Sequence, residues 1–148
     1  MSSVIRAAVK DDLEAVYGLM LQLSRHDFTK EQFESCYFYN LENNHIIVHE
    51  QDKHVCGCGV LNIHYSLHFS RKTAEIVNLV VDVNARNCGI GKALLAALEQ
   101  IAADNDCVCI KLDSGKQRID AHRFYAREGF ACSHYKFTKE LGNAANFL

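Results

Sequence analysis

The stretch that decides the fold runs from Ile76-Val77-Asn78-Leu79-Val80-Val81 through Arg86-Asn87-Cys88-Gly89-Ile90-Gly91 into Lys92-Ala93-Leu94-Leu95. The first run is typical of a buried strand, and the apolar residues after the glycines recur with helical spacing. The first N–H groups of a helix lack partners within the helix and carry partial positive charge. Glycine lets an anion approach the backbone closely. The segment therefore predicts a strand-to-helix turn that binds a diphosphate.

Two common phosphate loops do not match these residues. The Walker pattern needs glycine at the position of Arg86 and Ser or Thr after the lysine, but Ala93 follows Lys92. The dinucleotide pattern needs a small residue at the position of Leu94. The pattern that remains is R-x-x-G-x-G between a strand and a helix.

This pattern resembles the pyrophosphate loop of the GNAT acyltransferase superfamily, whose donor is acetyl-CoA. A second stretch, Ala121-His122-Arg123-Phe124-Tyr125-Ala126-Arg127-Glu128-Gly129-Phe130, resembles the A-x-x-F-Y-x-x-x-G-F segment of the same superfamily. Two matches in the right order are far more specific than one. The resemblance implies an acetyl-CoA-dependent N-acetyltransferase that acts on a small primary amine.

The rest of the chain predicts an α/β (α+β) fold of the GNAT type, with a mixed, mostly antiparallel sheet of six to seven strands and about four helices on both faces. We expect one domain over residues 1–148. The last strand but one follows a helix and runs parallel to its neighbour, as a βαβ crossover requires. Strands are predicted at residues 4–8, 45–49, 55–65, 73–83, 108–112 and 131–139, and helices at about 11–23, 29–41, 89–103 and 120–127.

Composition indicates which partners the chain has. A formal net charge of −2 without a concentrated Lys/Arg face argues against nucleic acid binding. The N-terminus lacks the apolar core of a signal peptide, and no run approaches the roughly 20 apolar residues of a membrane span. We therefore expect a cytoplasmic protein with seven reduced cysteines. Its expected partner is a small-molecule amine, and a homodimer is an option.

The resemblance also implies a donor site. In the superfamily, the strand before the loop bonds the pantetheine amides and donates an N–H to the acetyl carbonyl, while the loop holds the diphosphate. Many members carry Asn at the position of Arg118, where the Asn helps to fix the pantetheine and the helix. Arg118 departs from that pattern and could instead meet a phosphate or an anionic acceptor. The candidate donor residues are Leu79, Val80, Val81, Arg86, Asn87, Cys88, Gly89, Ile90, Gly91, Lys92, Arg118 and Phe124.

Two residues are candidates for the chemistry of acetyl transfer. Glu75 resembles a common acidic site of the superfamily and is expected to deprotonate the acceptor ammonium through water. Tyr125 is expected to protonate the CoA thiolate. A solvated charge at the strand end for Glu75, and packing against the pantetheine for Tyr125, remain alternatives.

A closer resemblance concerns the acceptor. The opening Ile5-Arg6-Ala7-Ala8 and the run Ser133-His134-Tyr135-Lys136 look like the aminoalkylphosphonate N-acetyltransferases. That family is described as using a divalent metal, for which Glu75 would be a ligand. Open alternatives are a cationic acceptor, such as an aminoglycoside, a polyamine or a protein N-terminus, and a non-catalytic CoA-binding module. Candidate residues for binding a phosphonate acceptor are His64 and His68, which we expect on one face of a strand, together with His122, Arg123 and His134.

Overall fold

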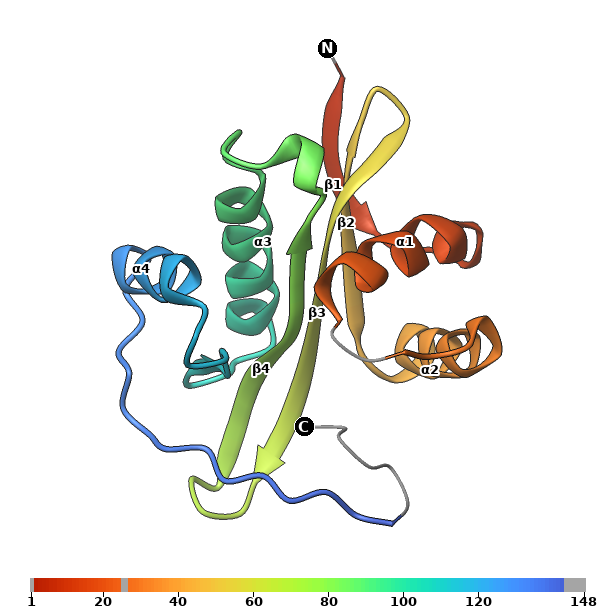
Figure 1. Cartoon of the computed structure of the whole chain (residues 1–148). Helices are drawn as coiled ribbons and strands as arrows, with labels where there is room; N and C mark the ends of the chain where they lie inside the picture. Colours follow the sequence, from red (N-terminus) through yellow and green to blue (C-terminus); the bar gives the residue numbers. More distant parts are fainter. Residues whose placement is uncertain (1, 25–26, 143–148) are drawn as a thin grey trace. The chain divides into compact units, whose positions relative to one another are not determined.

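Five strands form one sheet, in the order β1-β2-β3-β4-β5, in the computed structural model, which describes residues 2–24 and 27–142 (Figure 1). The first four strands are antiparallel neighbours, and β5 runs parallel to β4, as predicted. The described residues thus confirm the mixed sheet, but with five strands rather than six to seven. The strands are β1 (Ser3–Ala7), β2 (His45–Gln51), β3 (His54–Ser66), β4 (Arg71–Val81) and β5 (Ile110–Leu112).

The chain consists of two compact parts, residues 1–112 and residues 113–148, and each is described by itself. The first, which we call the sheet part, contains all five strands and three α-helices. In this part α1 and α2 cover one face of the sheet and α3 covers the other (Figure 1). Helices on both faces were predicted. The helices of the sheet part are α1 (Leu13–Leu23), α2 (Lys30–Asn43) and α3 (Ile90–Asp104).

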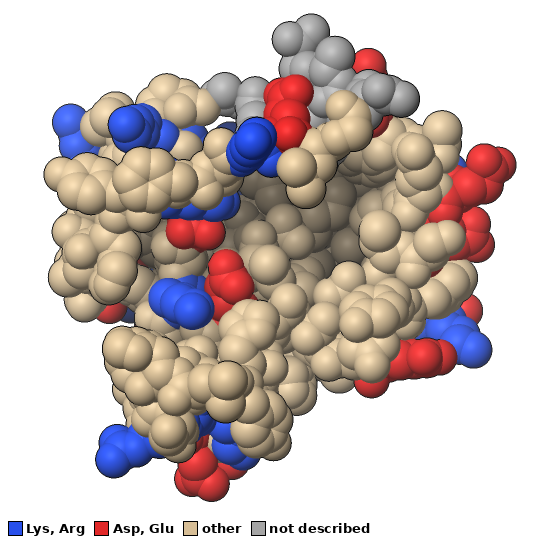
Figure 2. All heavy atoms as spheres, turned by 90° about the horizontal axis from the view of Figure 1, so that it is seen from below, with Lys and Arg blue, Asp and Glu red and all other residues tan. Residues whose placement is uncertain are grey.

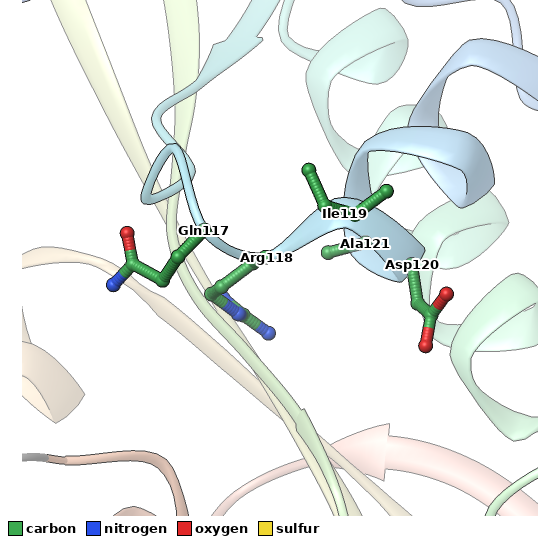
Figure 3. A pocket seen from close by; sticks show the side chains of 5 residues that line it. All are labelled: Gln117, Arg118, Ile119, Asp120 and Ala121. Carbon is green, nitrogen blue, oxygen red and sulfur yellow. The ribbon is translucent and has the colours of Figure 1, made fainter.

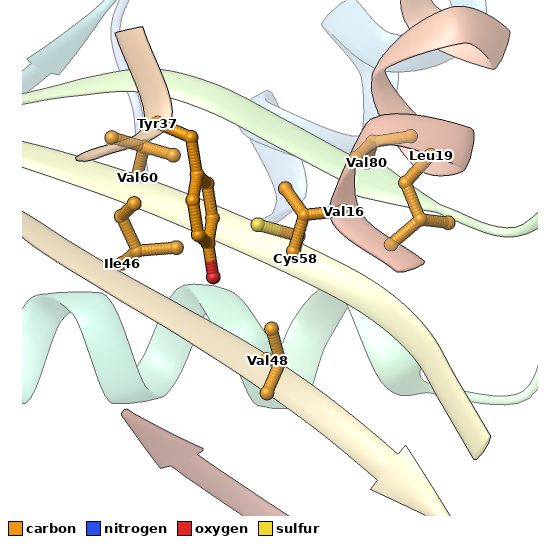
Figure 4. Packing of buried hydrophobic residues seen from close by; sticks show 8 residues of the cluster. All are labelled: Val16, Leu19, Tyr37, Ile46, Val48, Cys58, Val60 and Val80. Carbon is orange, nitrogen blue, oxygen red and sulfur yellow. The ribbon is translucent and has the colours of Figure 1, made fainter. Parts of the chain in front are cut away.

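The face under α1 and α2 carries an apolar core (Figure 4). Tyr37 of α2 is 3% exposed, and its hydroxyl donates a 2.6 Å hydrogen bond to the carbonyl of Val9. Burial raises the pKa of Tyr37, so the phenol stays neutral and the buried oxygen costs little. The cluster consists of Val16, Leu19, Tyr37, Ile46, Val48, Cys58, Val60 and Val80.

The opposite face is shaped by two glycines of β3. A Cβ at Gly57 would lie 2.8 Å from Leu94 Cδ1, and one at Gly59 would lie 2.9 Å from Leu98 Cδ1. Both leucines belong to α3 and are almost completely buried. The alternation Cys56-Gly57-Cys58-Gly59 therefore has a packing reason, because the glycines admit α3 while Cys58 points into the core under α1.

The second part, residues 113–148, contains helix α4 (Ile119–Arg127). The predicted strand at 131–139 is wrong, because these residues form no strand with any described residue and all are exposed. Tyr135 and Phe137 are 88% and 92% exposed. Alternating apolar side chains report strand propensity, but a strand exists only where a neighbour accepts its backbone hydrogen bonds. The predicted strand at 108–112 is likewise shorter, beginning at Ile110.

Candidate active site

Strand β4 contains one extra residue relative to β3. Val60 pairs with Asn78 and the next residue, Leu61, pairs with Ile76, so Val77 bulges out of the ladder. A bulge reverses the alternation of side chains along a strand. As a result β4 has two halves, Arg71 to Ile76 and Asn78 to Val81. The side chains of each half alternate between the faces of the sheet independently of the other half.

The half from Asn78 to Val81 exposes one edge. The Asp82 N–H donates to the Cys56 carbonyl at 2.8 Å, so that residue faces β3. Alternate residues face opposite ways, which directs the backbone groups of Leu79 and Val81 away from β3. Strand β5 pairs only with Ala74–Ile76, so no strand of the described residues covers this edge. An extended ligand bearing amides can add to such an edge.

The loop after β4 ends in two residues with left-handed backbone. Asn87 has φ 65° and Gly89 has φ 80°, and α3 begins at Ile90. Ala93 donates to the Gly89 carbonyl at 3.1 Å, which places the unpaired N–H groups of the first turn at Ile90, Gly91 and Lys92. No side chain caps them from Gly89. The predicted strand-to-helix turn is therefore confirmed, and its donors are those that an anion needs.

Arg86, Cys88 and Lys92 surround this turn. The guanidinium of Arg86 donates from Nε to the Val81 carbonyl at 3.3 Å, which joins the loop to the end of β4. The Cys88 thiol lies 3.6 Å from the Arg86 carbonyl and is exposed. Lys92 is also exposed. Two cations thus border the turn, as a diphosphate requires.

The other half of β4 and the facing part of β3 carry four polar side chains, which we call the polar quartet. Asn62 pairs with Glu75 and His64 pairs with Thr73, so all four share one face. Alternation along β3 puts that face on the side of Cys58 and Val60, beyond the apolar core. The quartet therefore continues the face of the apolar core toward the β3–β4 hairpin.

Glu75 contacts His64 directly. His64 Nε2 lies 3.1 Å from Glu75 Oε1, and the side chains are 44% and 28% exposed. Thr73 is 1% exposed, and neither its Oγ1 nor Asn62 Oδ1 has a hydrogen-bond partner among the described residues. Neither Asn62 nor Thr73 was predicted from the sequence. Only the register across the bulge brings them together, and periodicity contains no signal for it.

The residues around Glu75 do not fit the expected divalent metal site. In the described parts of the chain, no group of three or more His, Cys, Asp or Glu side chains lies close enough to hold an ion. His68, expected on the same strand face as His64, lies beyond the end of β3 in the turn, where its ring packs against Phe69 at 5.0 Å. The shared-face prediction was wrong because the strand ends at Ser66.

Tyr125 belongs to the second part, near the end of α4. Gly129, with φ 92°, terminates the helix as predicted, and its N–H donates to the Ala126 carbonyl at 3.2 Å. The Phe130 N–H donates to the Tyr125 carbonyl at 3.0 Å, and the two rings contact at 5.7 Å. This is a Schellman cap with its apolar contact. The F-Y-x-x-x-G-F spacing thus holds the Tyr125 ring, whose pKa is raised by burial.

The remaining predicted residues of this part are paired locally. Arg118 precedes α4 and borders an open hollow of about 310 Å³ (Figure 3). His122 Nε2 lies 2.8 Å from the Gly115 carbonyl, and His134 contacts Ser133 at 2.6 Å. Arg123 lies 3.7 Å from Asp120. Phe124 packs edge-on against Tyr125 at 5.3 Å. None of these contacts joins them to the polar quartet.

Charges of both signs are interspersed on the face shown in Figure 2, and no large Lys/Arg surface is visible there. Among the described helices, none is long and apolar enough to cross a bilayer. The interspersed charges on this face agree with a site for small molecules rather than for a polyanion.

The comparisons with known proteins agree with this geometry. The chain is 34% identical to the aminoalkylphosphonate N-acetyltransferase of Salmonella typhimurium over 139 residues, covering 93% of this chain and 90% of that protein. A transcriptional regulator from Bacillus halodurans has a similar structure, with TM-score 0.84, 26% identity and coverage of 95% and 100%. An aminoglycoside N-acetyltransferase in complex with CoA has TM-score 0.85, 17% identity and coverage of 95% for both chains, and it shows the shared fold alone.

The fold, the strand-to-helix turn at residues 86–92, which we call the anion-binding turn for the role we assign to it, and the open strand edge are together typical of an acyltransferase. Residues 13–130, which are most of the chain, match the acetyltransferase (GNAT) family. This chain belongs to that family. Members of this family take their acetyl group from acetyl-CoA.

Proposed function

We propose that this protein transfers the acetyl group of acetyl-CoA to the primary amine of an aminoalkylphosphonate. One observation carries the proposal: a single strand, β4, bears the open edge that leads to the anion-binding turn and, across its bulge, the carboxylate of Glu75. A donor bound along one half of the strand would therefore end near an acceptor held at the other half. We take residues 1–148 to act as one catalytic domain.

The donor is assigned to the sheet part. The N–H groups of Ile90, Gly91 and Lys92 would bind the diphosphate, with Arg86 neutralising charge beside it. The pantetheine amides would pair with the open edge at Leu79 and with the N–H of Val81, whose carbonyl already accepts from Arg86 Nε. A backbone N–H of this edge would stabilise the oxyanion that forms when the amine attacks the thioester carbonyl.

Two proton transfers accompany the attack. Glu75 would take the proton from the acceptor ammonium, directly or through a water, so that the nitrogen lone pair can form the new C–N bond. When the C–S bond breaks, the CoA thiolate would take a proton from the Tyr125 hydroxyl. Burial raises the pKa of Tyr125, which keeps that proton available at neutral pH.

The phosphonate needs a cation near the quartet. Arg71 lies two residues before Thr73 on the same face of β4, is exposed, and forms no ion pair within the described residues. Four residues along a strand span roughly 13 Å, a separation that the extended side chain of Arg71 and an aminoalkylphosphonate with its amine at Glu75 can bridge together. We assign Arg71 to the phosphonate, ahead of the five candidates taken from the sequence. The identity to the Salmonella protein supports this acceptor class.

The test compares acceptors that share a primary amine and differ in their other end. Initial rates with acetyl-CoA are measured for 2-aminoethylphosphonate, β-alanine, propylamine, spermidine and an aminoglycoside. We expect the phosphonate to have the highest kcat/KM, and Arg71→Ala to raise its KM about tenfold while the rate with propylamine is unchanged. Lys53→Ala, a change in the β2–β3 turn, serves as the charge-matched control. Equal kcat/KM for the phosphonate and propylamine would reject the phosphonate assignment.

A further inference from the structure

The polar quartet has two diagonals of different character. His64 and Glu75 form one diagonal, closed by the 3.1 Å contact between Nε2 and Oε1. Asn62 and Thr73 form the other, and each contributes an oxygen that is buried and unpartnered within the described residues. Buried polar atoms without partners are uncommon and destabilising, so two on adjacent strand pairs call for an explanation.

The His64 side chain runs diagonally across the quartet. To reach Glu75 from its position opposite Thr73, the imidazole has to cross the quartet, above the Asn62–Thr73 diagonal. Its side chain is 44% exposed, so one side of the ring is open to solvent. When the contact with Glu75 opens, an outward rotation of the ring would uncover the quartet face, which carries the Glu75 carboxylate, Asn62 Oδ1 and Thr73 Oγ1.

A primary ammonium carries three N–H donors and no acceptor. We propose that the quartet is a recognition site for a primary ammonium, in which Glu75, Asn62 and Thr73 each accept one hydrogen and His64 is displaced as the ammonium binds. The site deepens the proposed function, on which it rests, by assigning the acceptor's nitrogen to two residues, Asn62 and Thr73, that position it for Glu75. A secondary amine offers one hydrogen fewer and leaves one of the two buried oxygens unpaired.

The proposal predicts effects of opposite sign within one quartet. Asn62→Ala and Thr73→Val remove an accepting oxygen, so both weaken acceptor binding. His64→Ala removes the group that competes for Glu75 and covers the oxygens, so it strengthens binding. A phosphonate-binding role for His64, as expected from the sequence, requires His64→Ala to weaken it instead.

Acceptor affinity is measured by calorimetry in the presence of CoA, with 2-aminoethylphosphonate and its N-methyl derivative, and again with propylamine and N-methylpropylamine. We expect wild type to bind each primary amine about tenfold more tightly than its N-methyl partner. Thr73→Val should abolish that ratio, Thr73→Ser should retain it, and His64→Ala should lower the Kd of the primary amines severalfold. CoA affinity, measured separately, should stay at the wild-type value throughout.

An unchanged ratio in both Thr73→Val and Asn62→Ala would overturn the proposal, as would a loss of affinity in His64→Ala. Binding of Mn²⁺ to wild type that is lost in Asn62→Ala would also overturn it, since the quartet would then hold a cation other than the ammonium. Selectivity for primary amines that persists with propylamine, in a protein without preference for the phosphonate, would sustain the quartet while rejecting the proposed acceptor.

Discussion

Arg6 donates two parallel hydrogen bonds to Asp12, from Nη1 to Oδ2 at 2.8 Å and from Nη2 to Oδ1 at 2.9 Å. Its Nε donates to Glu50 Oε2 at 2.7 Å, and the Val9 N–H donates to the same Asp12 carboxylate at 2.8 Å. Asp12 is 7% exposed. The pair thereby joins β1, β2 and the entry to α1, and it orients the helix that covers the apolar core.

Removing the charge of Asp12 should destabilise the fold. The hydrogen bonds from Arg6 lower the pKa of Asp12, so its folded pKa lies below its unfolded value of about 3.9. The stabilisation is therefore complete above about pH 4 and is lost as pH falls through the folded pKa. Asp12→Asn should lower the free energy of unfolding by on the order of 2 kcal/mol at pH 7 in urea titrations. The difference from wild type should shrink below pH 4, whereas Lys30→Ala, which breaks an exposed pair with Glu14, should change little.

At Gly89 in the anion-binding turn, the effect of a negative charge on donor binding can be tested separately from the effect of backbone conformation. Gly89 has φ 80°, and no atom lies within 4 Å of the place that a Cβ would take, so only the backbone and the ligand oppose a side chain. Asn tolerates this conformation, and Asp has the same shape with a negative charge. Gly89→Asp should weaken CoA binding at least 100-fold by calorimetry, and Gly89→Asn should weaken it much less. Similar affinities for the two variants would mean that no diphosphate binds at this turn.

Tyr125→Phe keeps the ring contacts with Phe124 and Phe130 but removes the proton donor. We expect kcat to fall roughly 100-fold while the Kd of CoA is unchanged. Because burial raises the pKa of Tyr125, wild type should keep this contribution up to at least pH 10 and lose it above, as the phenol ionises. Turnover of the Phe variant at the wild-type level would assign Tyr125 to packing.

The Schellman cap of α4 should also affect protonation of the CoA thiolate by Tyr125, and Gly129 is the residue that tests it. Gly129→Ala places a Cβ at φ 92°, which costs on the order of 1 kcal/mol and loosens the Phe130 contact that holds Tyr125. We expect kcat to fall severalfold with CoA affinity retained. Gly18→Ala, in the middle of α1 with open space around the added Cβ, is the matched control and should leave kcat unchanged.

The close approach of α3 to β3 can be tested by a double-mutant cycle. Gly59→Ala would place its Cβ 2.9 Å from Leu98 Cδ1, so we expect a loss of about 1–3 kcal/mol. Leu98→Ala should cost roughly 2–5 kcal/mol by leaving a cavity. In the double variant the new methyl meets no leucine, so the combined loss should be smaller than the sum of the two in chemical denaturation. Strict additivity would mean that the helix shifts to admit the methyl.

The sequence predicted those features that depend on local chemistry. The strand before Arg86 and the helix after the glycine-containing turn are dictated within a few residues, and so is the cap at Gly129. The left-handed backbone at Gly89 was not predicted. The parallel placement of β5 follows from the length of the crossover helix.

Features that depend on pairing between distant segments were missed. Asn62 and Thr73 became site residues only through a bulge whose position no periodicity reveals. The strand predicted at 131–139 had the right alternation, yet its residues pair with no described strand. The prediction that His64 and His68 share a strand face failed for a related reason, because β3 ends two residues before His68.

The extra residue at Val77 has a consequence for how this enzyme can diverge. It separates the pairing register of one half of β4 from that of the other. The half that would meet the thioester would therefore keep its alignment with β3 when residues in the other half change. Changes at the tip of the β3–β4 hairpin, including insertions between Ser66 and Arg71, can then alter the choice of amine while the donor's track is preserved. If donor and acceptor bind β4 as proposed, selectivity in this chain would be modular at the level of a single strand.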